Sequence, residues 1–512
     1  MFEASKISKQ EKISFFSCII VGILSQGMGL FNKFSVHDDA NSLFALGATF
    51  NVGRWSLDII GKLEKVFFGN VNYSLPLYNG MLSLFFIALT ACIIVKAFEI
   101  SNPYICAFIG AVLACFPTVT TAFGFIYGAH IIMFGLFIGI LGAYLICTGK
   151  TIWWRLLGVL LAATSVGDYQ AFIPMMISFI LFYCIHMVWK VEKGSEKEVV
   201  IQILLKPLYI VGFMVVYFII NKIYLGILGA EMSSYKGVDE VGNVPITQYL
   251  IRVLVAYKQF LLPSKNTDFY MYPSNVRILY YVFAVIGAAL AGYSLYKKSK
   301  QSVLAFLALL ALYALVPLAT NFIIVMTGTD VIHSYMMYAA VMPFVLTAYL
   351  VEKIASEISI ENIIKRAFIV FCCMLLVMYI RYDNKCYFLA NYAQQEAISY
   401  FTTLITRIKS VEGYDDEYPV AYINECNIND ETLSGVESVK RKAFDDVNQI
   451  PYWNVKLYVN NYAWRDFMLN WCGYKPQEVD ASGVDAAVID SMPHYPDDGS
   501  IKVIDGIVIV NF

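Results

Sequence analysis

The fold is decided by an apolar run that ends at a charged cluster. Residues 13–31 read ISFFSCIIVGILSQGMGLF, and residues 34–41 read FSVHDDAN. The apolar run is close to the ~20 residues that a helix needs to cross the hydrocarbon of a bilayer. Charge beside hydrocarbon is costly, so His37-Asp38-Asp39 directly beyond the run indicates a functional group at the membrane surface. We therefore predict a membrane helix followed by a loop that carries an enzymatic centre, with His37 in contact with the substrate.

The composition is that of a chain that crosses the membrane many times. Of 512 residues, 59% are hydrophobic and 15% are charged, whereas a soluble domain carries about 25% charged residues. Residues 383–512 hold 10 Lys and Arg against 20 Asp and Glu, while residues 1–382 hold 27 against 19. We expect a transmembrane domain over 1–382 and a separate acidic α/β domain over 383–512. No basic stripe occurs, which argues against nucleic-acid binding.

Apolar runs of helical length predict an all-α polytopic bundle of about eleven spans. These runs lie at residues 13–31, 76–98, 103–120, 126–148, 152–166, 170–190, 206–227, 276–296, 303–325, 335–351 and 365–382. Lys and Arg concentrate in alternate loops, which the positive-inside rule places in the cytoplasm. We therefore expect a cell-membrane protein with its N-terminus in the cytoplasm. Because the number of spans is odd, the C-terminal domain is then extracytoplasmic, on the same face as the loop 32–75.

Shorter elements are expected outside the spans. Residues 40–50 and 55–68 have helical apolar spacing and predict two helices along the membrane surface. Patterns of the tail predict helices at 391–411 and 463–472 and strands at 420–423, 455–459 and 503–510, the last as part of a hairpin.

Asp38 and Asp39 are the candidate catalytic residues. Neighbouring side chains point in different directions, so one carboxylate can face a cavity while the other braces the loop. Burial beside a like charge raises the pKa of a carboxyl toward the range of a general base. The alternative is a solvated cluster that caps the following helix, since Asp is a good N-cap residue. Which carboxylate would take the proton stays open, with Asp38 preferred.

Two further polar groups border apolar runs. Arg54 lies between a Gly and a Trp, where it can hold a phosphate by a bidentate contact or serve only as an interfacial anchor. Asp168, Tyr169 and Gln170 follow Gly167 between two apolar runs. They can hydrogen-bond sugar hydroxyls, or they can form a plain turn between helices. We predict that these four polar side chains bind substrate.

Three residues of other predicted outer loops complete the candidates for substrate binding. Arg252 and Lys258 lie on an amphipathic run at 246–262 and can steer an anionic headgroup, although solvated surface explains them equally well. His333 lies in a short loop, where a lone His is more often structural than a ligand.

These motifs resemble those of a known family. The Asp-Asp after the first span, the Gly-Arg-Trp at 53–55, the Gly-Asp-Tyr-Gln at 167–170 and the ending Met-Pro-His-Tyr-Pro-Asp-Asp-Gly-Ser at 492–500 are similar to bacterial GtrII-type glucosyltransferases. That family belongs to the GT-C class of membrane glycosyltransferases. The resemblance covers most of the chain and implies a GT-C-like fold whose first outer loop carries the catalytic Asp.

The resemblance also implies a reaction. The donor would be a polyprenyl-phosphate sugar, with undecaprenyl-phosphate glucose expected, and the acceptor a cell-surface glycan or lipid-linked polymer. Transfer would invert the anomeric carbon, with Asp38 or Asp39 as the base and Arg54 at the phosphate. A donor-making synthase and a flippase would supply the donor on the outer face. No cofactor is expected, since a phosphate held by Arg needs no metal and the sequence offers no cage of carboxylates.

Other classes of protein fit the residues less well. The sequence has no Gly-rich phosphate loop, nucleotide-binding βαβ unit, His-Glu-x-x-His or Gly-x-Ser-x-Gly. An outer-face enzyme has no ready nucleotide sugars, which agrees with a lipid carrier. The alternative is a transporter or flippase of polysaccharide or lipid-linked sugar, for which charged or broken helices at mid-membrane and repeat symmetry are expected. Here the polar groups cluster at one face, which favours the transferase.

Overall fold

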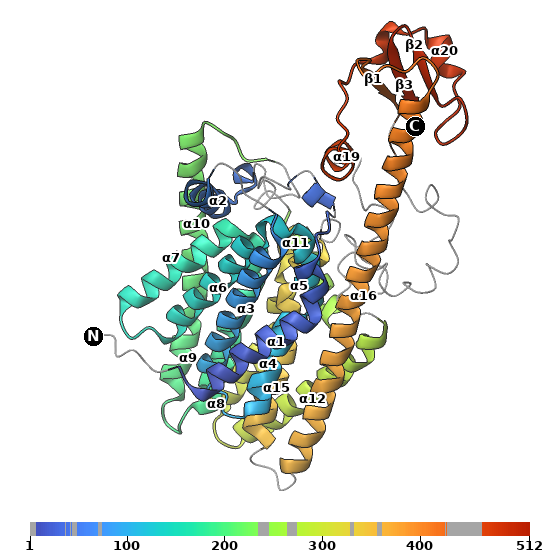
Figure 1. The fold of residues 1–512 in the computed structure, drawn as a ribbon. Helices are drawn as coiled ribbons and strands as arrows, with labels where there is room; N and C mark the ends of the chain where they lie inside the picture. Colours follow the sequence, from blue (N-terminus) through green and yellow to red (C-terminus); the bar gives the residue numbers. More distant parts are fainter. Residues whose placement is uncertain are drawn as a thin grey trace.

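The chain forms a bundle of long helices from which one helix, α16 (Glu361–Ser410), reaches out to a small sheet (Figure 1). The structure is a computed structural model. It describes residues 7–35, 37–40, 42, 49–69, 74–233, 245–263, 274–327, 332–355, 361–424, 426 and 463–512.

The bundle confirms the predicted polytopic helical architecture. Within the described part of the chain, eight helical segments are long and apolar enough to cross a membrane. Its helices before α16 are α1 (Lys9–Phe31), α2 (Trp55–Phe68), α3 (Pro76–Ala97), α4 (Pro103–Cys115), α5 (Pro117–Ala122), α6 (Ile126–Thr148), α7 (Ile152–Asp168), α8 (Ile173–Lys190), α9 (Glu196–Leu204), α10 (Lys206–Leu228), α11 (Ile246–Leu261), α12 (Ser274–Ser299), α13 (Val303–Thr320), α14 (Phe322–Thr327) and α15 (Met342–Ala355).

The predicted count of eleven spans stays a prediction, because several runs are short or interrupted. The predicted spans at 103–120 and 126–148 fall in one helical segment, Pro103–Thr148. This segment is broken at Phe116, which is extended because it precedes a proline. The run at 335–351 begins with short 3-10 turns, and its helix α15 has 14 residues.

Helix α1 lies at the centre of the amino-terminal half because its glycines and those of its neighbours allow close packing. A Cβ on Gly110 of α4 would collide with the carbonyl oxygen of Ser14 on α1. A Cβ on Gly22 of α1 would lie 2.6 Å from a methyl carbon of Leu84 on α3. Small residues of this kind bring membrane helices together where no hydrophobic force drives them.

A buried polar network joins α1 to α16. The hydroxyl of Tyr387 donates to Oε1 of Gln26 at 2.7 Å, and Thr120 Oγ1 donates to the same oxygen at 3.1 Å. Beside it, the Ser25 hydroxyl donates to the carboxylate of Asp383. Side-chain hydrogen bonds of this kind hold helices together in an apolar surrounding. They fix the middle of α16 against the end of α1 that leads into the candidate catalytic loop.

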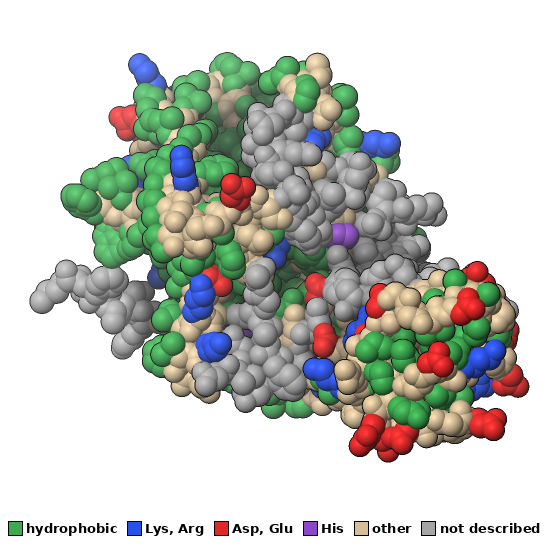
Figure 2. Space-filling view, turned by 90° about the horizontal axis from the view of Figure 1, so that it is seen from above, with side chains coloured by type: hydrophobic (Ala, Val, Ile, Leu, Met, Phe, Trp, Pro, Cys, Tyr) green, Lys and Arg blue, Asp and Glu red, His purple; other side chains and the backbone are tan. Residues whose placement is uncertain are grey.

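Among its described residues, the C-terminal region has a three-stranded sheet and two α-helices. Strands β1 (Val420–Ile423), β3 (Ile507–Asn511) and β2 (Ile501–Ile504) lie in that order, with β1 parallel and β2 antiparallel to β3. Helix α19 (Trp464–Cys472) lies between the sheet and the bundle, and α20 is Ala486–Asp490 (Figure 1). Seen from above, acidic side chains gather on this lobe (Figure 2).

Most predictions for the shorter elements are confirmed. The helix at 55–68, the strand at 420–423, the hairpin and the helix at 463–472 are all present. Residues 455–459 and most of 40–50 lie outside the described residues. The predicted helix at 391–411 is instead the far part of α16, which continues without a break from the span that precedes it. The predicted domain boundary at 382/383 therefore falls inside a helix.

Candidate functional site

The segment around Arg54 is held by a glycine turn and a tyrosine hydroxyl. Gly53 has φ +80°, a left-handed conformation that favours glycine. It ends the 3-10 turn Phe50–Val52 and lets α2 begin at Trp55. The Tyr217 hydroxyl on α10 donates to the Gly53 carbonyl at 3.1 Å, and a Cβ on Gly53 would collide with this hydroxyl. The turn is thereby fixed against α10.

The Gly-Arg-Trp and Gly-Asp-Tyr-Gln motifs lie side by side. The indole of Trp55 packs against Gly167, where an added Cβ would collide with the ring. Gln170 Nε2 donates to the carbonyl of Val52 at 2.8 Å. Two motifs that are more than a hundred residues apart in sequence therefore form one site.

Within this site Arg54 interacts electrostatically with a buried carboxylate. Asp168 is fully buried at the end of α7, where it lies against the backbone of Gly135 and no side chain donates a hydrogen bond to it. The guanidinium of Arg54 lies within electrostatic range of this carboxylate. Its carbon is 5.0 Å from the ring centroid of Tyr169, and its Nε has no hydrogen-bond partner. The site thus contains a cation and an anion with unused hydrogen-bonding capacity.

A row of aromatic rings extends the site toward His333. The rings of Tyr169 and Tyr335 stack with centroids 6.3 Å apart, and those of Tyr335 and His333 stack at 5.5 Å. His333 precedes the 3-10 turn Ser334–Met336 and is partly buried. The structure therefore brings His333 into the row of side chains that begins at Arg54.

Arg54, Tyr169 and Gln170 form the polar end of a cavity of about 440 Å³. Its walls come from α8, α10, α14 and the turns beside them, and they are almost entirely apolar. Val215 and Phe218 of α10 belong to the wall and are 49% and 45% exposed, so the cavity reaches the outer surface of the bundle. It is an apolar chamber with a cationic end.

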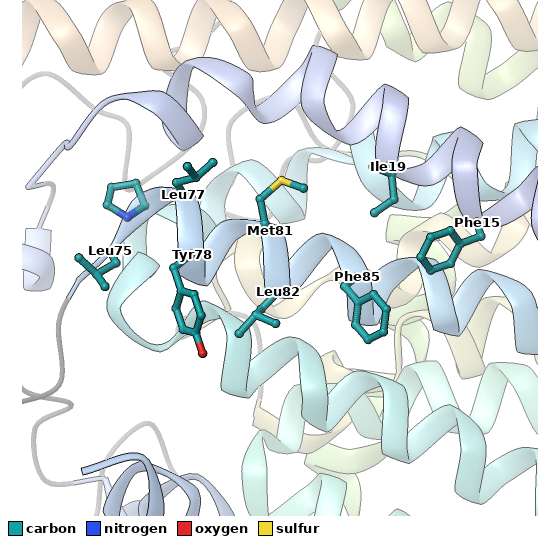
Figure 3. A pocket seen from close by; sticks show the side chains of 9 residues that line it. Phe15, Ile19, Leu75, Leu77, Tyr78, Met81, Leu82 and Phe85 are labelled. Carbon is teal, nitrogen blue, oxygen red and sulfur yellow. The ribbon is translucent and has the colours of Figure 1, made fainter. Parts of the chain in front are cut away.

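A second hollow, between α1 and α3, has no such polar end (Figure 3). This groove of about 790 Å³ runs along the outside of the bundle. Its lining side chains are apolar or aromatic, among them Phe15, Ile19, Met81 and Phe85. Because the lining contains no charged side chain, the groove has nothing with which to hold a phosphate.

Asp39 is held in place by an ion pair and a hydrogen bond. It lies in the 3-10 turn His37–Ala40, is fully buried and forms an ion pair with Lys33. The Ser74 hydroxyl donates to its Oδ1 at 2.5 Å, and Lys33 Nζ donates to the Ser74 oxygen at 3.0 Å. Burial raises the pKa of the Asp39 carboxyl and lowers that of the Lys33 ammonium, while the ion pair opposes both shifts. Both oxygens of Asp39 are thus engaged.

Asp38 is partly exposed, unlike the fully buried Asp39. Tyr127, at the start of α6, lies within electrostatic range of Asp38, Asp39 and Arg54. Tyr127 therefore interacts electrostatically both with the loop that carries the two carboxylates and with Arg54. His37 is the neighbour of Asp38 in the 3-10 turn.

Of the predicted binding residues, Arg54, Tyr169 and Gln170 line the cavity, whereas Asp168, Arg252, Lys258 and His333 do not. Arg252 Nη1 donates to the carbonyls of Val325 and Met326 at 3.3 and 3.5 Å, so it joins α11 to the end of α14. Its guanidinium lies over Tyr249, which does line the cavity. Lys258 is exposed near the other end of α11.

The sequence analysis did not identify five residues that contact the predicted site residues or lie beside them. They are Lys33, Ser74, Tyr127, Tyr217 and Tyr335. For Lys33 a signal existed, since it is a cation a few residues before two carboxylates at the end of a span. The described residues include no group of three or more His, Cys, Asp or Glu side chains placed to hold a metal ion.

Comparison with known proteins gives one match. A model of the family described as glucosyl transferase GtrII matches residues 27–344, which include the Asp38 loop, Arg54 and the turn at 167–170. No curated protein and no solved structure matches. The match covers more than half of the chain. This membrane protein therefore belongs to the GtrII glucosyltransferase family and is a glycosyltransferase.

Proposed function

We propose that the protein transfers a sugar, with glucose expected, from a polyprenyl phosphate to a hydroxyl of a cell-surface glycan or lipid-linked acceptor. The observation that carries the proposal is the cavity beside Arg54, because it joins apolar walls to a cationic end. A polyprenyl phosphate has the same division into a long apolar chain and a charged phosphate.

In this proposal the guanidinium of Arg54 binds the donor phosphate. Its Nε has no hydrogen-bond partner within the protein, and the ring of Tyr169 stabilises the cation. Val215 and Phe218 border the side of the cavity that faces outward from the bundle. The isoprenoid chain enters the cavity from the bilayer on this side.

Asp168 keeps Arg54 in place before the donor binds. A buried carboxylate that accepts no hydrogen bond from a side chain is costly unless a cation lies close to it, so the two groups stabilise each other. Because Asp168 is fully buried and does not line the cavity, it acts on the donor only through Arg54. Gln170 acts through its bond to the Val52 carbonyl, which holds the segment before Arg54.

Asp38 is the general base of an inverting transfer. It takes the proton of the acceptor hydroxyl, whose oxygen attacks the anomeric carbon on the face opposite the phosphate. The bond from the anomeric carbon to the phosphate oxygen breaks as the new bond forms, and the phosphate leaves with that electron pair. Arg54 stabilises the charge of the leaving phosphate. Asp39 braces the loop, since Lys33 and Ser74 occupy its oxygens.

The reaction takes place on the extracytoplasmic face. Lys and Arg concentrate in the loops of the opposite side, which agrees with a cytoplasmic N-terminus. A synthase makes the donor in the cytoplasm, and a flippase moves it across the membrane. The acidic C-terminal region then lies outside the cell membrane, on the side where the acceptor is displayed.

Transfer in reconstituted vesicles tests the proposal. Vesicles receive labelled polyprenyl-phosphate glucose and, as acceptor, membranes of a strain that lacks the protein. Asp38→Asn is expected to abolish transfer with normal insertion, and Asp490→Asn, at an exposed residue of α20, to retain it. Transfer by Asp38→Asn at the wild-type rate contradicts the mechanism. Transfer by the wild type from a nucleotide sugar alone contradicts the donor.

A further inference from the structure

The candidate catalytic loop is held by a helix from the other end of the chain. The backbone N–H of Ser35 donates to Oε1 of Gln394 at 3.1 Å, and Nε2 of Gln394 donates to the carbonyl of Lys33 at 3.2 Å. Gln394 lies on α16 and is 5% exposed. One amide therefore satisfies a backbone donor and a backbone acceptor on the chain that enters the loop.

The exit of the loop has a contact of the same kind. Asn470 on α19 donates from Nδ2 to the carbonyl of Ala40 at 3.3 Å. Ala40 is the residue that follows the two carboxylates. In Figure 1, α19 lies between the C-terminal sheet and the top of the bundle. The backbone on both sides of the carboxylates is thus bound by side chains of the C-terminal region.

Apolar packing joins the same elements. Phe34 stacks on Tyr387 of α16, with ring centroids 6.2 Å apart. Phe34 and Ala40 belong to one hydrophobic core with Phe401 of α16 and Phe467 of α19. The loop and the C-terminal region therefore share a core and do not merely touch. A displacement of α16 or α19 would move the loop with it.

We infer that Gln394 and Asn470 are positioning residues, which hold the loop so that Asp38 points at the acceptor hydroxyl. The inference rests on the proposed function, because it takes Asp38 as the base. Both residues lie beyond residue 344, where the match to the family model ends. The C-terminal region is then part of the catalytic machinery and not only an external lobe.

The physical reason is the lack of regular structure in the loop. Its 3-10 turn is four residues long, and no strand pairing was found for it among the described residues. Side chains must then supply the hydrogen bonds that fix its backbone. A shift of about 1 Å in a reacting group can lower the rate about 100-fold. Loss of one anchor is expected to lower kcat by about 10- to 100-fold.

Two neighbouring glutamines allow a matched test. Gln394→Met keeps the length of the side chain and removes both hydrogen bonds, whereas Gln395→Met makes the same change at the exposed residue beside it. With polyprenyl-phosphate glucose as the varied substrate, Gln394→Met is expected to lower kcat and leave the donor KM within about twofold, since Arg54 is untouched. Gln395→Met should behave as the wild type.

Two further variants keep the test decisive. Asn470→Leu should lower kcat in the same way. Gln394→Glu keeps the acceptor for Ser35 and should retain more activity than Gln394→Met. A wild-type kcat for both Gln394→Met and Asn470→Leu overturns the inference, as does a change confined to KM.

Asp38→Asn separates the two proposals. If that variant transfers sugar normally, the proposed base is wrong; if it is inactive while the anchors are dispensable, only the positioning role fails.

Discussion

Replacing Arg54 and Asp168 singly and together separates two roles of this pair. Arg54→Met leaves the fully buried carboxylate of Asp168 without its cation. Removing one partner of a buried ion pair costs about 3–5 kcal/mol. Here the two groups form no direct salt bridge and Arg54 borders a cavity, so we expect a loss of about 2 kcal/mol in the free energy of unfolding. The double variant Arg54→Met/Asp168→Asn leaves no charge at this pair and should recover most of the lost stability.

Activity should not recover with stability. A hydrogen bond to a charged group contributes about 2–3 kcal/mol when its partner is buried. With 1.36 kcal/mol for each factor of ten, loss of the contact to the leaving phosphate lowers kcat/KM by about 30- to 150-fold. The same loss is expected for Arg54→Met alone and for the double variant, because neither can stabilise the phosphate.

A double-mutant cycle with two readouts measures both effects. Thermal unfolding in detergent is recorded for the wild type, both single variants and the double variant, and sugar transfer is measured on the same preparations. The reasoning is refuted if the double variant regains transfer together with stability, since Arg54 would then serve only as a counter-ion. It is also refuted if Arg54→Met is as stable as the wild type.

Two other predictions concern the turn and the cavity. Gly53→Ala should destabilise the protein by about 1–2 kcal/mol and reduce transfer, because the residue has φ +80° and its Cβ would collide with the Tyr217 hydroxyl. Gly27→Ala, where no atom lies within 4 Å of the added carbon, should unfold at the wild-type temperature. Met214→Trp fills the cavity and should raise the KM of a long-chain donor about tenfold more than that of a short-chain donor. Ile219 of α10 is 54% exposed and does not line the cavity, so Ile219→Trp should change neither KM. Equal effects of Met214→Trp on both donors would show that the isoprenoid chain lies elsewhere.

Local chemistry made several elements predictable. The hairpin turn Asp505-Gly506 has φ +50° and +76°, as the two central residues of a tight hairpin require, and an Asp-Gly pair favours it. Ser8 caps the start of helix α1, and its hydroxyl accepts from the N–H of Glu11 in a capping box. Such signals lie within a few residues of one another, so the sequence alone is enough to find them.

The continuity of α16 could not be read from local signals. Asp383 suggests the end of a span, because a charged residue follows eighteen mostly apolar ones. In the structure its carboxylate accepts a hydrogen bond from Ser25 on α1, so the helix continues through this position. The partner is more than three hundred residues away, and no pattern around Asp383 indicates it.

The sequence by itself determined that this chain is a polytopic membrane protein and which polar residues border its apolar runs. Composition and the length of those runs are enough, since the cost of charge in hydrocarbon acts on every residue alike. Only the tertiary structure decided how these residues combine. It paired Asp39 with Ser74, brought Arg54 within electrostatic range of Asp168, and placed Gln394 against the loop. These interactions join distant segments, so they depend on how the helices pack.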